Sequence, residues 1–184
     1  MPKVGKAELI LFNFMLKVKV LMQIIKKLLS LRYQTLQIMT NIVLPVDFSD
    51  ATDKLLDGAV KFAKQTQGKI FLIHVAPSDI GFAIGDMGFQ YFPEIEQNEI
   101  KEELNMLNDL QMRISNQGVE CEHMLRQGIA KDIILEYAED KSADYIVMGS
   151  HGRSGIYDVF VGSLTKDLTK SSPLPVLVIP CHNK

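Results

Sequence analysis

Glycine recurs in a short segment that follows an apolar run and precedes a helical pattern, at Gly149, Gly152, Gly155 and Gly162. Because glycine has no side chain, backbone N–H groups beside it can approach a phosphate closely. The helix that follows adds N–H donors and a favourable dipole, and Ser163 at its start can both cap it and contact phosphate. The segment therefore predicts phosphate binding, although tight turns alone would explain the glycines equally well.

Asp47 is the second candidate for a functional residue. It directly follows the apolar run of residues 42–46, just as Gly149 follows the apolar run of residues 145–148. In an open parallel sheet, ligands bind beyond the carboxyl ends of the strands where the topology reverses, so both residues would face one crevice. We interpret Asp47 as a nucleotide or metal contact rather than a helix cap. The sequence lacks a GxxxxGK[ST] loop and a GxGxxG turn after the first strand, the two commoner phosphate motifs.

Alternating apolar runs and helical patterns supply the frame for these residues. Strands are predicted over residues 42–46, 70–75, 119–125, 145–148 and 176–179, and helices over residues 55–63, 100–114, 130–138 and 163–172. This alternation is typical of an α/β fold with an open parallel sheet covered on both faces. Glu120 and Glu122 alternate with apolar residues, which places the third strand at a sheet edge.

Local signals mark the ends of the elements. Gly68 and Gly118 are predicted to end helices, and the polar residues of segment 47–50 offer capping side chains for the first one. His74, at the end of a buried strand, is expected to be a packed residue. The glycine- and aromatic-rich connection over residues 77–93 is expected to be a lid or a packing segment.

The glycine spacing resembles that of a known family. Gly149-x2-Gly152-x9-Gly162-Ser163 matches the G-2x-G-9x-G-(S/T) pattern of the ATP-binding branch of the universal stress protein family. Segments 46–49, 74–75, 148–153 and 175–180 are similar to the other motifs of that family, so the resemblance runs from about residue 40 to residue 180. It implies a Rossmann-like fold of the adenine nucleotide α-hydrolase type, with five parallel strands in the order 3-2-1-4-5.

The resemblance also implies a ligand and its contacts. The ligand is ATP, carried with Mg²⁺ or Mn²⁺, and Asp47 lies near the ribose or the metal. His151 either contacts phosphate or shapes the turn. The implied binding residues are Pro45, Val46, Asp47, Val75 (through its backbone, at the adenine edge), Met148, Gly149, Gly152, Arg153, Gly162, Ser163 and Leu164.

These residues predict an ATP-binding stress-response or signalling protein with at most slow ATP hydrolysis, because no general base is evident. Two alternatives stay open: a structural dimer without nucleotide binding, and an ATP-using enzyme of the wider α-hydrolase group. The SGGxDS-type loop of that group is missing after the first strand. In the family the last strand commonly pairs with its twin, which implies a homodimer through Val176, Leu177, Val178 and Ile179.

Composition excludes several classes of protein. The 184 residues are 47% hydrophobic and 23% charged, a balance typical of one globular domain rather than a disordered chain. Cys121 and Cys181 form no CxxC pair, which argues against a disulfide scaffold or zinc site and favours a reducing cytoplasm. Residues 39–184 carry 13 Lys or Arg against 21 acids, a net charge of −8 that opposes nucleic-acid binding.

The first 38 residues differ in charge from the rest. They carry seven Lys or Arg and one acid, Glu8, a net charge of +6. Met39 is followed at once by Thr40-Asn41 and the first strand, so we interpret residues 1–38 as an extension outside a folded unit of residues 39–184, or a misassigned start. Their uncharged runs are too short to span a membrane. The alternative is a basic amphipathic helix on a membrane surface.

Overall fold

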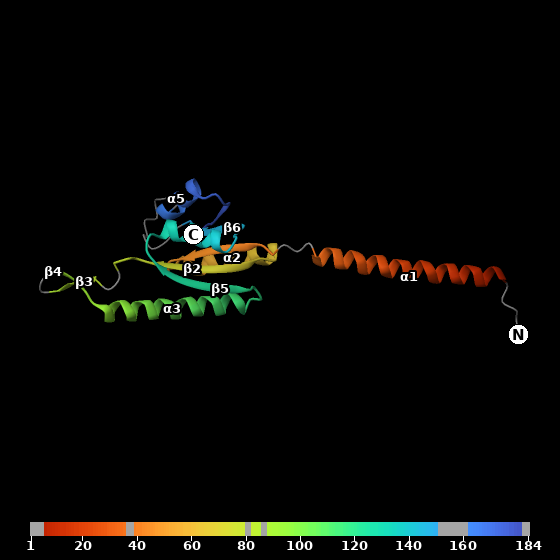
Figure 1. The fold of residues 1–184 in the computed structure, drawn as a ribbon, viewed down its shortest axis with the longest axis horizontal. Helices are drawn as coiled ribbons and strands as arrows, with labels where there is room; N and C mark the ends of the chain where they lie inside the picture. Colours follow the sequence, from red (N-terminus) through yellow and green to blue (C-terminus); the bar gives the residue numbers. More distant parts are fainter. Residues whose placement is uncertain (1–5, 36–38, 80–81, 86–87, 151–161, 182–184) are drawn as a thin grey trace. The chain divides into compact units, whose positions relative to one another are not determined.

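The computed structural model describes residues 6–35, 39–79, 82–85, 88–150 and 162–181. The chain divides into two compact units, Met1–Ile38 and Met39–Lys184. Helix α1, Lys6–Thr35, is the element of the first unit, and the second contains the sheet and its helices (Figure 1). Within the described residues, we find no helix whose length and apolar content would carry it through a lipid bilayer.

A five-stranded parallel sheet forms the centre of the second unit. Its strands are β1 (Asn41–Val46), β2 (Lys69–Ala76), β5 (Cys121–Gln127), β6 (Tyr145–Gly149) and β7 (Val176–Ile179). They lie in the order β5-β2-β1-β6-β7, with every neighbouring pair parallel. The predicted order 3-2-1-4-5 is therefore confirmed, as is the edge position of the strand that follows Glu120.

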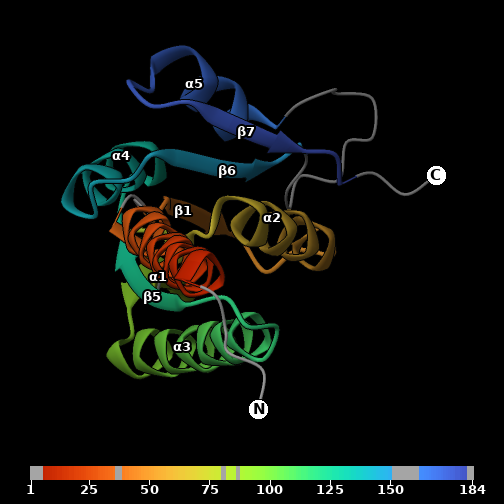
Figure 2. The ribbon, with the colours of Figure 1, turned by 90° about the vertical axis from the view of Figure 1, so that its right-hand side faces the viewer.

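Helices cover both faces of this sheet. Helices α2 (Thr52–Thr66) and α3 (Pro93–Ser115) pack on one face, and α4 (Ala130–Asp140) and α5 (Ser163–Ser171) pack on the other (Figure 2). Consecutive residues of β1 point to opposite faces, so Ile42 and Leu44 join the α2–α3 core while Val43 joins the α4–α5 core. All three are fully buried, and each contributes about 1.5–3 kcal/mol through burial.

The connection over residues 77–93 contains an element that the sequence did not predict. Strands β3 (Phe82–Gly85) and β4 (Gly88–Tyr91) pair antiparallel, from Phe82↔Tyr91 to Gly85↔Gly88. Each strand has four residues, which is too short for an alternating pattern to be recognised. Among the described residues, the two strands form a separate two-stranded sheet.

The ends of α2 correct two further predictions. The left-handed residue after α2 is Gln67, with φ 53°, rather than Gly68. Gly68 is needed for a close approach instead, since a Cβ there would lie 2.8 Å from the carbonyl oxygen of Thr40. No side chain caps the start of α2; the carbonyl of Ser49 accepts the N–H of Thr52 at 2.9 Å.

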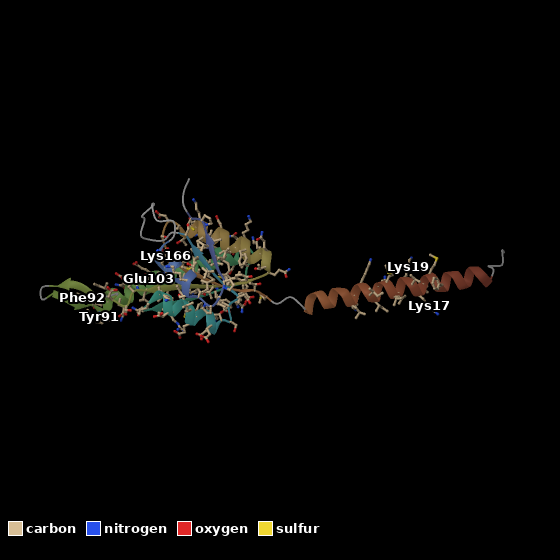
Figure 3. All side chains as sticks on the ribbon, turned by 90° about the horizontal axis from the view of Figure 1, so that it is seen from above. Lys17, Lys19, Tyr91, Phe92, Glu103 and Lys166 are labelled. Carbon is tan, nitrogen blue, oxygen red and sulfur yellow. The ribbon has the colours of Figure 1, made fainter. Side chains whose placement is uncertain are left out.

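Helix α1 exposes its apolar side chains. Between residues 14 and 28, where the side chains are described, every residue is exposed, the apolar ones included (Figure 3). The large apolar side chains of this stretch are therefore exposed rather than packed in a core.

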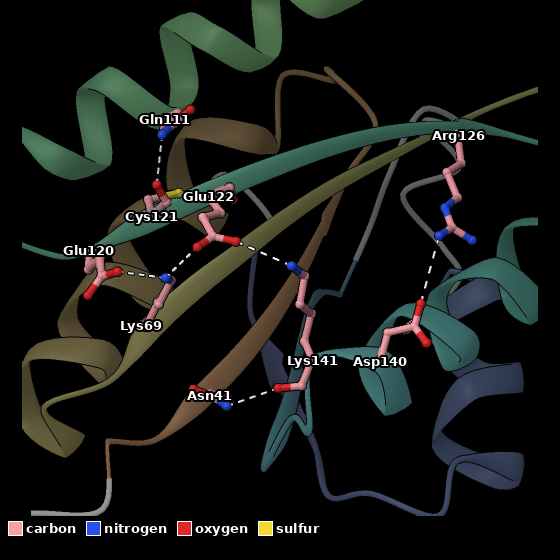
Figure 4. Close-up of polar contacts among 9 residues, drawn as sticks. All are labelled: Asn41, Lys69, Gln111, Glu120, Cys121, Glu122, Arg126, Asp140 and Lys141. Atoms are coloured by element: carbon pink, nitrogen blue, oxygen red, sulfur yellow. Dashed lines mark hydrogen bonds and ion pairs between the residues drawn. The ribbon is translucent and has the colours of Figure 1, made fainter.

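Charged side chains link the edge strand to its neighbours (Figure 4). The ammonium group of Lys69 on β2 lies 2.6 Å from Glu120 and 2.5 Å from Glu122, and Lys141 lies 3.3 Å from Glu122. The hydrogen bonds from Lys69 and Lys141 lower the pKa of Glu122. Because both glutamates are about half exposed, water screens these pairs, and they contribute little to stability.

Both cysteines are buried, and this makes a testable prediction about pH. Burial raises the pKa of Cys121 to about 12 and also raises that of Cys181. The reactive thiolate therefore forms only far above neutral pH in the folded protein. At pH 8 we expect Cys121 to react with Ellman's reagent at least about a hundredfold more slowly than in urea-unfolded protein, and Cys181 to be slowed in the same direction. Rapid labelling of Cys121 in protein that keeps its native circular dichroism would contradict this burial.

Candidate functional site

A cavity opens where β1 and β6 part. β1 pairs with β2 to its last residue, Val46, but with β6 only as far as Val43. The carbonyl of Asn41 accepts the N–H of Asp144 at 2.8 Å, so alternate residues of β1 turn their backbone groups toward β6. Pro45 is one of these, and it has no N–H to offer. The ladder between β1 and β6 therefore stops before the carboxyl end of β1.

This position is also where the chain changes the face of the sheet. The crossovers from β1 through β2 to β5 place α2 and α3 on one face, whereas α4 returns to β6 on the other face and α5 leads on to β7. The sheet end between β1 and β6 is the usual place for a ligand in an open α/β sheet. The cavity there has a volume of about 270 Å³, near the lower end of the roughly 300–1,000 Å³ common for ligand sites.

Most of the binding residues expected from the sequence line this one cavity. They are Pro45, Val46, Asp47, Val75, Met148, Gly149, Gly162, Ser163 and Leu164. His151, Gly152 and Arg153 lie outside the described residues. Sequence reasoning missed Leu55, Ile73, His74, Ala130, Ile134 and Thr165, which also line the cavity. All six positions belong to predicted strands or helices, and five of them carried no signal beyond packing. Thr165 stands two residues after Ser163, in a segment rich in hydroxyl groups.

Asp47 begins a tight turn at the mouth of the cavity. Its Oδ1 accepts hydrogen bonds from the N–H of Ser49 at 3.1 Å and from the Ser49 hydroxyl at 2.7 Å. Phe48 between them has φ 56°, a left-handed conformation that is rare for an aromatic residue. Its ring lies 4.4 Å from the ring of His74, centroid to centroid. The turn thus holds the Asp47 carboxylate beside the carboxyl end of β1.

Hydrogen bonds from buried hydroxyl groups join β6, α5 and the segment after β7. The hydroxyl of Thr165 donates to the carbonyl of Gly149 at 2.9 Å, and Ser150 accepts the N–H of Cys181 on its hydroxyl at 2.9 Å. The carbonyl of Ser150 accepts the N–H of Gly162 at 2.8 Å. Residues 150 and 162, which bracket the undescribed segment, are therefore held together at the rim of the cavity.

Gly162 is the N-cap residue of α5, and its backbone conformation does not require glycine. Its φ of −58° suits any residue. A Cβ at this position would meet no described atom closer than the carbonyl oxygen of Ser150, at 3.9 Å, an ordinary contact. Neither backbone strain nor the packing of the described residues therefore requires glycine here.

The cavity alone offers few metal ligands. Among the described residues no three His, Cys, Asp or Glu side chains gather in a group that could hold a metal ion. Asp47 is the one carboxylate among the described residues that line the cavity. This donor set fits Mg²⁺ or Mn²⁺ only when phosphate oxygens supply most of the other ligands, as Mg²⁺ sites with nucleotides usually do.

His74 is packed, as expected, but it also contacts the cavity and ties it to α3. Its side chain is 4% exposed. Its Nδ1 lies 2.7 Å from the carbonyl oxygen of Val46, and its Nε2 lies 3.3 Å from Oε1 of Glu103 on α3. Nε2 makes no hydrogen bond with the described residues, so its approach to Glu103 is a close polar contact only. The contact of Nδ1 with the carbonyl oxygen of Val46 is the one that holds the imidazole at the end of β1.

Comparison with known proteins identifies the family. The profile described as "Universal stress protein family" matches residues 39–180. The chain belongs to this family. The match spans the whole sheet and all four of its helices, so the cavity lies within the universal stress protein domain.

Known universal stress proteins resemble the chain over most of their length. Universal stress protein YxiE of Bacillus subtilis is 32% identical over 139 residues, which are 73% of this chain and 94% of that protein. MJ0577 of Methanocaldococcus jannaschii is 29% identical over 154 residues, 77% of this chain and 95% of that protein. The solved structure of MJ0577 superposes with a TM-score of 0.63, covering 79% of this chain and 98% of its own.

A solved structure with a ligand shares the fold. The universal stress protein from Archaeoglobus fulgidus in complex with dAMP superposes with a TM-score of 0.56 at 23% identity, covering 77% of this chain and 98% of that chain. The universal stress protein fold predicted from the sequence is thus shared with this structure.

The contact between His74 and Glu103 can be tested by substitution. Replacing Glu103 with leucine removes the carboxylate that lies 3.3 Å from the buried Nε2 of His74, so we expect the free energy of unfolding to fall by about 2 kcal/mol at pH 7. Glu103→Gln keeps a polar partner and should cost less. Urea unfolding measures both, with Glu102→Leu on the exposed side of α3 as the matched control. Equal stability of the Glu103→Leu and Glu102→Leu proteins would contradict the role of Glu103.

Proposed function

We propose that this universal stress protein binds ATP in the cavity between β1 and β6 and acts as a nucleotide-dependent regulator in stress response or signalling. The observation that carries the proposal is the convergence, on one cavity, of the carboxyl ends of two strands and the N-terminus of α5. The lining combines apolar residues of β1, β2 and α4 with Gly149 of β6 and with Gly162 and Ser163 at the start of α5. This combination suits a nucleotide, which has a flat apolar base at one end and anionic phosphates at the other.

The chemistry of the lining residues suggests how ATP would lie. Adenine would pack among Val46, Ile73 and Ile134 and bond the backbone of Val75 at the end of β2. Phosphates would lie against Gly149 and the first turn of α5, where N–H groups have no partner within the helix. His151, Gly152 and Arg153 would complete the phosphate site. A divalent metal ion, bound with Asp47 and the phosphates, would neutralise part of the phosphate charge.

The comparisons support the choice of an adenine nucleotide. The Archaeoglobus fulgidus protein that shares this fold was solved with dAMP. Its ligand contains the adenine base and a phosphate but not a triphosphate. The choice of ATP for this chain rests on its own glycine spacing, Gly149-x2-Gly152-x9-Gly162-Ser163.

The titratable side chains that line the cavity support at most slow hydrolysis of ATP. Among its described residues these groups are Asp47 and His74. The carboxylate of Asp47 accepts two hydrogen bonds from Ser49, and the imidazole of His74 lies between Val46 and Glu103. Both side chains are held by neighbours rather than directed at an attacking water, whereas fast phosphoryl transfer needs such positioning. The proposed function is therefore ATP binding, with at most slow hydrolysis.

A homodimer through β7 belongs to the same proposal. β7 ends the sheet, and its residues Val176 to Ile179 are only partly buried. An apolar edge strand presents unpaired backbone groups that invite another strand. Pairing with the β7 strand of a second copy would cover this edge and bring two nucleotide sites into one assembly.

Gly162→Thr tests the binding of ATP. Threonine and glycine are similar N-caps, so α5 should keep its stability, but the new side chain would occupy the space of a phosphate. We expect the affinity for ATP with Mg²⁺, measured by calorimetry, to fall at least about tenfold while the melting temperature stays within about 2 °C. Ser172→Thr, at the other end of α5, is the matched control and should bind like wild type.

The same proteins separate the alternatives. Wild type that binds no ATP would favour a structural dimer, and wild type that releases phosphate at several turnovers per second would favour an enzyme. Unchanged affinity in Gly162→Thr would place the phosphates elsewhere and contradict the geometry proposed for α5.

A further inference from the structure

The described side chains of α1, from residue 14 to residue 28, are exposed and mostly apolar. Its large apolar side chains between residues 14 and 28 are 42–64% exposed. They are Phe14, Met15, Leu16, Val18, Val20, Leu21, Met22, Ile24, Ile25 and Leu28. The remaining five residues of the stretch are four lysines and Gln23. An exposed apolar surface of this extent marks contact with a protein or a membrane.

Seven of these side chains share one side of the helix. At 3.6 residues per turn, Phe14, Met15, Val18, Leu21, Met22, Ile25 and Leu28 fall within less than half of the circumference, with no charged residue among them. We call these seven residues the apolar stripe. Lys17 borders the apolar stripe on one side, and Lys19 and Lys26 border it on the other. In Figure 3, Lys17 and Lys19 point away from opposite sides of α1.

Between Phe14 and Leu28 the charges of α1 have a single sign, since the acid of this helix, Glu8, lies outside that stretch. The sequence contains no Asp or Glu between Glu8 and Asp47, but it contains Lys17, Lys19, Lys26 and Lys27 within the described stretch. A partner that complements this helix must offer apolar volume to the stripe and negative charge along both of its borders. The acyl chains and headgroups of an anionic bilayer supply both, since lysine stems can lie along the apolar layer while their ammonium groups reach the phosphates.

We propose that α1 lies in the surface of an anionic lipid bilayer, with the apolar stripe buried and the bordering lysines among the headgroups. The bilayer thereby holds the universal stress protein domain at the membrane. This proposal does not depend on nucleotide binding. The domain, residues 39–184, carries a net charge of −8 and would be repelled by the same surface, which leaves α1 as the element in contact.

A second copy of the chain is the competing occupant. Phe14, Val18, Leu21, Ile25 and Leu28 are spaced 4, 3, 4 and 3 residues apart, as in the seam of a coiled coil. Such seams are normally flanked by charges of both signs that pair between helices. The stretch from Phe14 to Leu28 contains no acid, so two copies would bring lysines toward lysines. Charge complementarity therefore favours the lipid surface.

Flotation of the full chain with lipid vesicles tests the proposal. At 0.15 M salt we expect the protein to float with vesicles of phosphatidylcholine and phosphatidylglycerol (7:3), and not with phosphatidylcholine alone. Binding should weaken as salt is raised, because salt screens exposed charges. Lys19→Gln with Lys26→Gln should lower the partition coefficient by at least about tenfold, since each lysine near an anionic surface contributes about 1 kcal/mol.

Two matched double variants test whether vesicle binding depends on the apolar stripe or on the overall hydrophobicity of α1. Val18→Gln with Ile25→Gln changes the stripe, whereas Val20→Gln with Ile24→Gln makes the same changes outside it. We expect the first pair to reduce partitioning at least about tenfold and the second less than about threefold. The proposal is overturned if the full chain stays unbound to anionic vesicles, or if both pairs have equal effects. A further result would also overturn it. In that case Val18→Gln with Ile25→Gln, but not the second pair, would dissociate an oligomer of the chain in sedimentation experiments and leave vesicle binding unchanged.

Discussion

The parting of β1 from β6 at Pro45 is the constraint on which the candidate site depends. β1 is the central strand, and its ladder to β2 continues to Val46 while its ladder to β6 ends at Val43. A residue with an N–H at position 45 could extend the second ladder; proline cannot. The carboxyl ends of the two strands therefore diverge where the crossovers turn to opposite faces, and the cavity occupies the space between them.

Two polar arrangements hold this opening in shape. On one side, the imidazole of His74 bonds the carbonyl of Val46 and meets Glu103, so α3 helps to position the end of β1. On the other side, the hydroxyls of Ser150 and Thr165 join β6, α5 and the segment after β7. All of these groups except Glu103 are at least nine-tenths buried, where an unmet hydrogen bond costs about 1–3 kcal/mol. These contacts position the residues on both sides of the cavity.

Much of the fold could be predicted from periodicity, and the strand order from the resemblance, because buried parallel strands and amphipathic helices leave long patterns. The four-residue strands β3 and β4 left none, and the left-handed Gln67 stands beside a glycine that misled the prediction. Within the site, the glycine spacing identified Gly162 and Ser163. The contact between His74 and Glu103 joins residues 29 positions apart on different elements, which no local pattern encodes.

The most direct test of the central claim is NMR titration of backbone amides with ATP and Mg²⁺. If ATP binds in the cavity between β1 and β6, the largest shift changes fall on Val75, Gly149, Gly162, Ser163 and Leu164, and amides of the edge strand β5 beyond the cavity, such as Glu122, change little. Shift changes that are absent at millimolar ATP, or that centre on a different surface, would contradict the account.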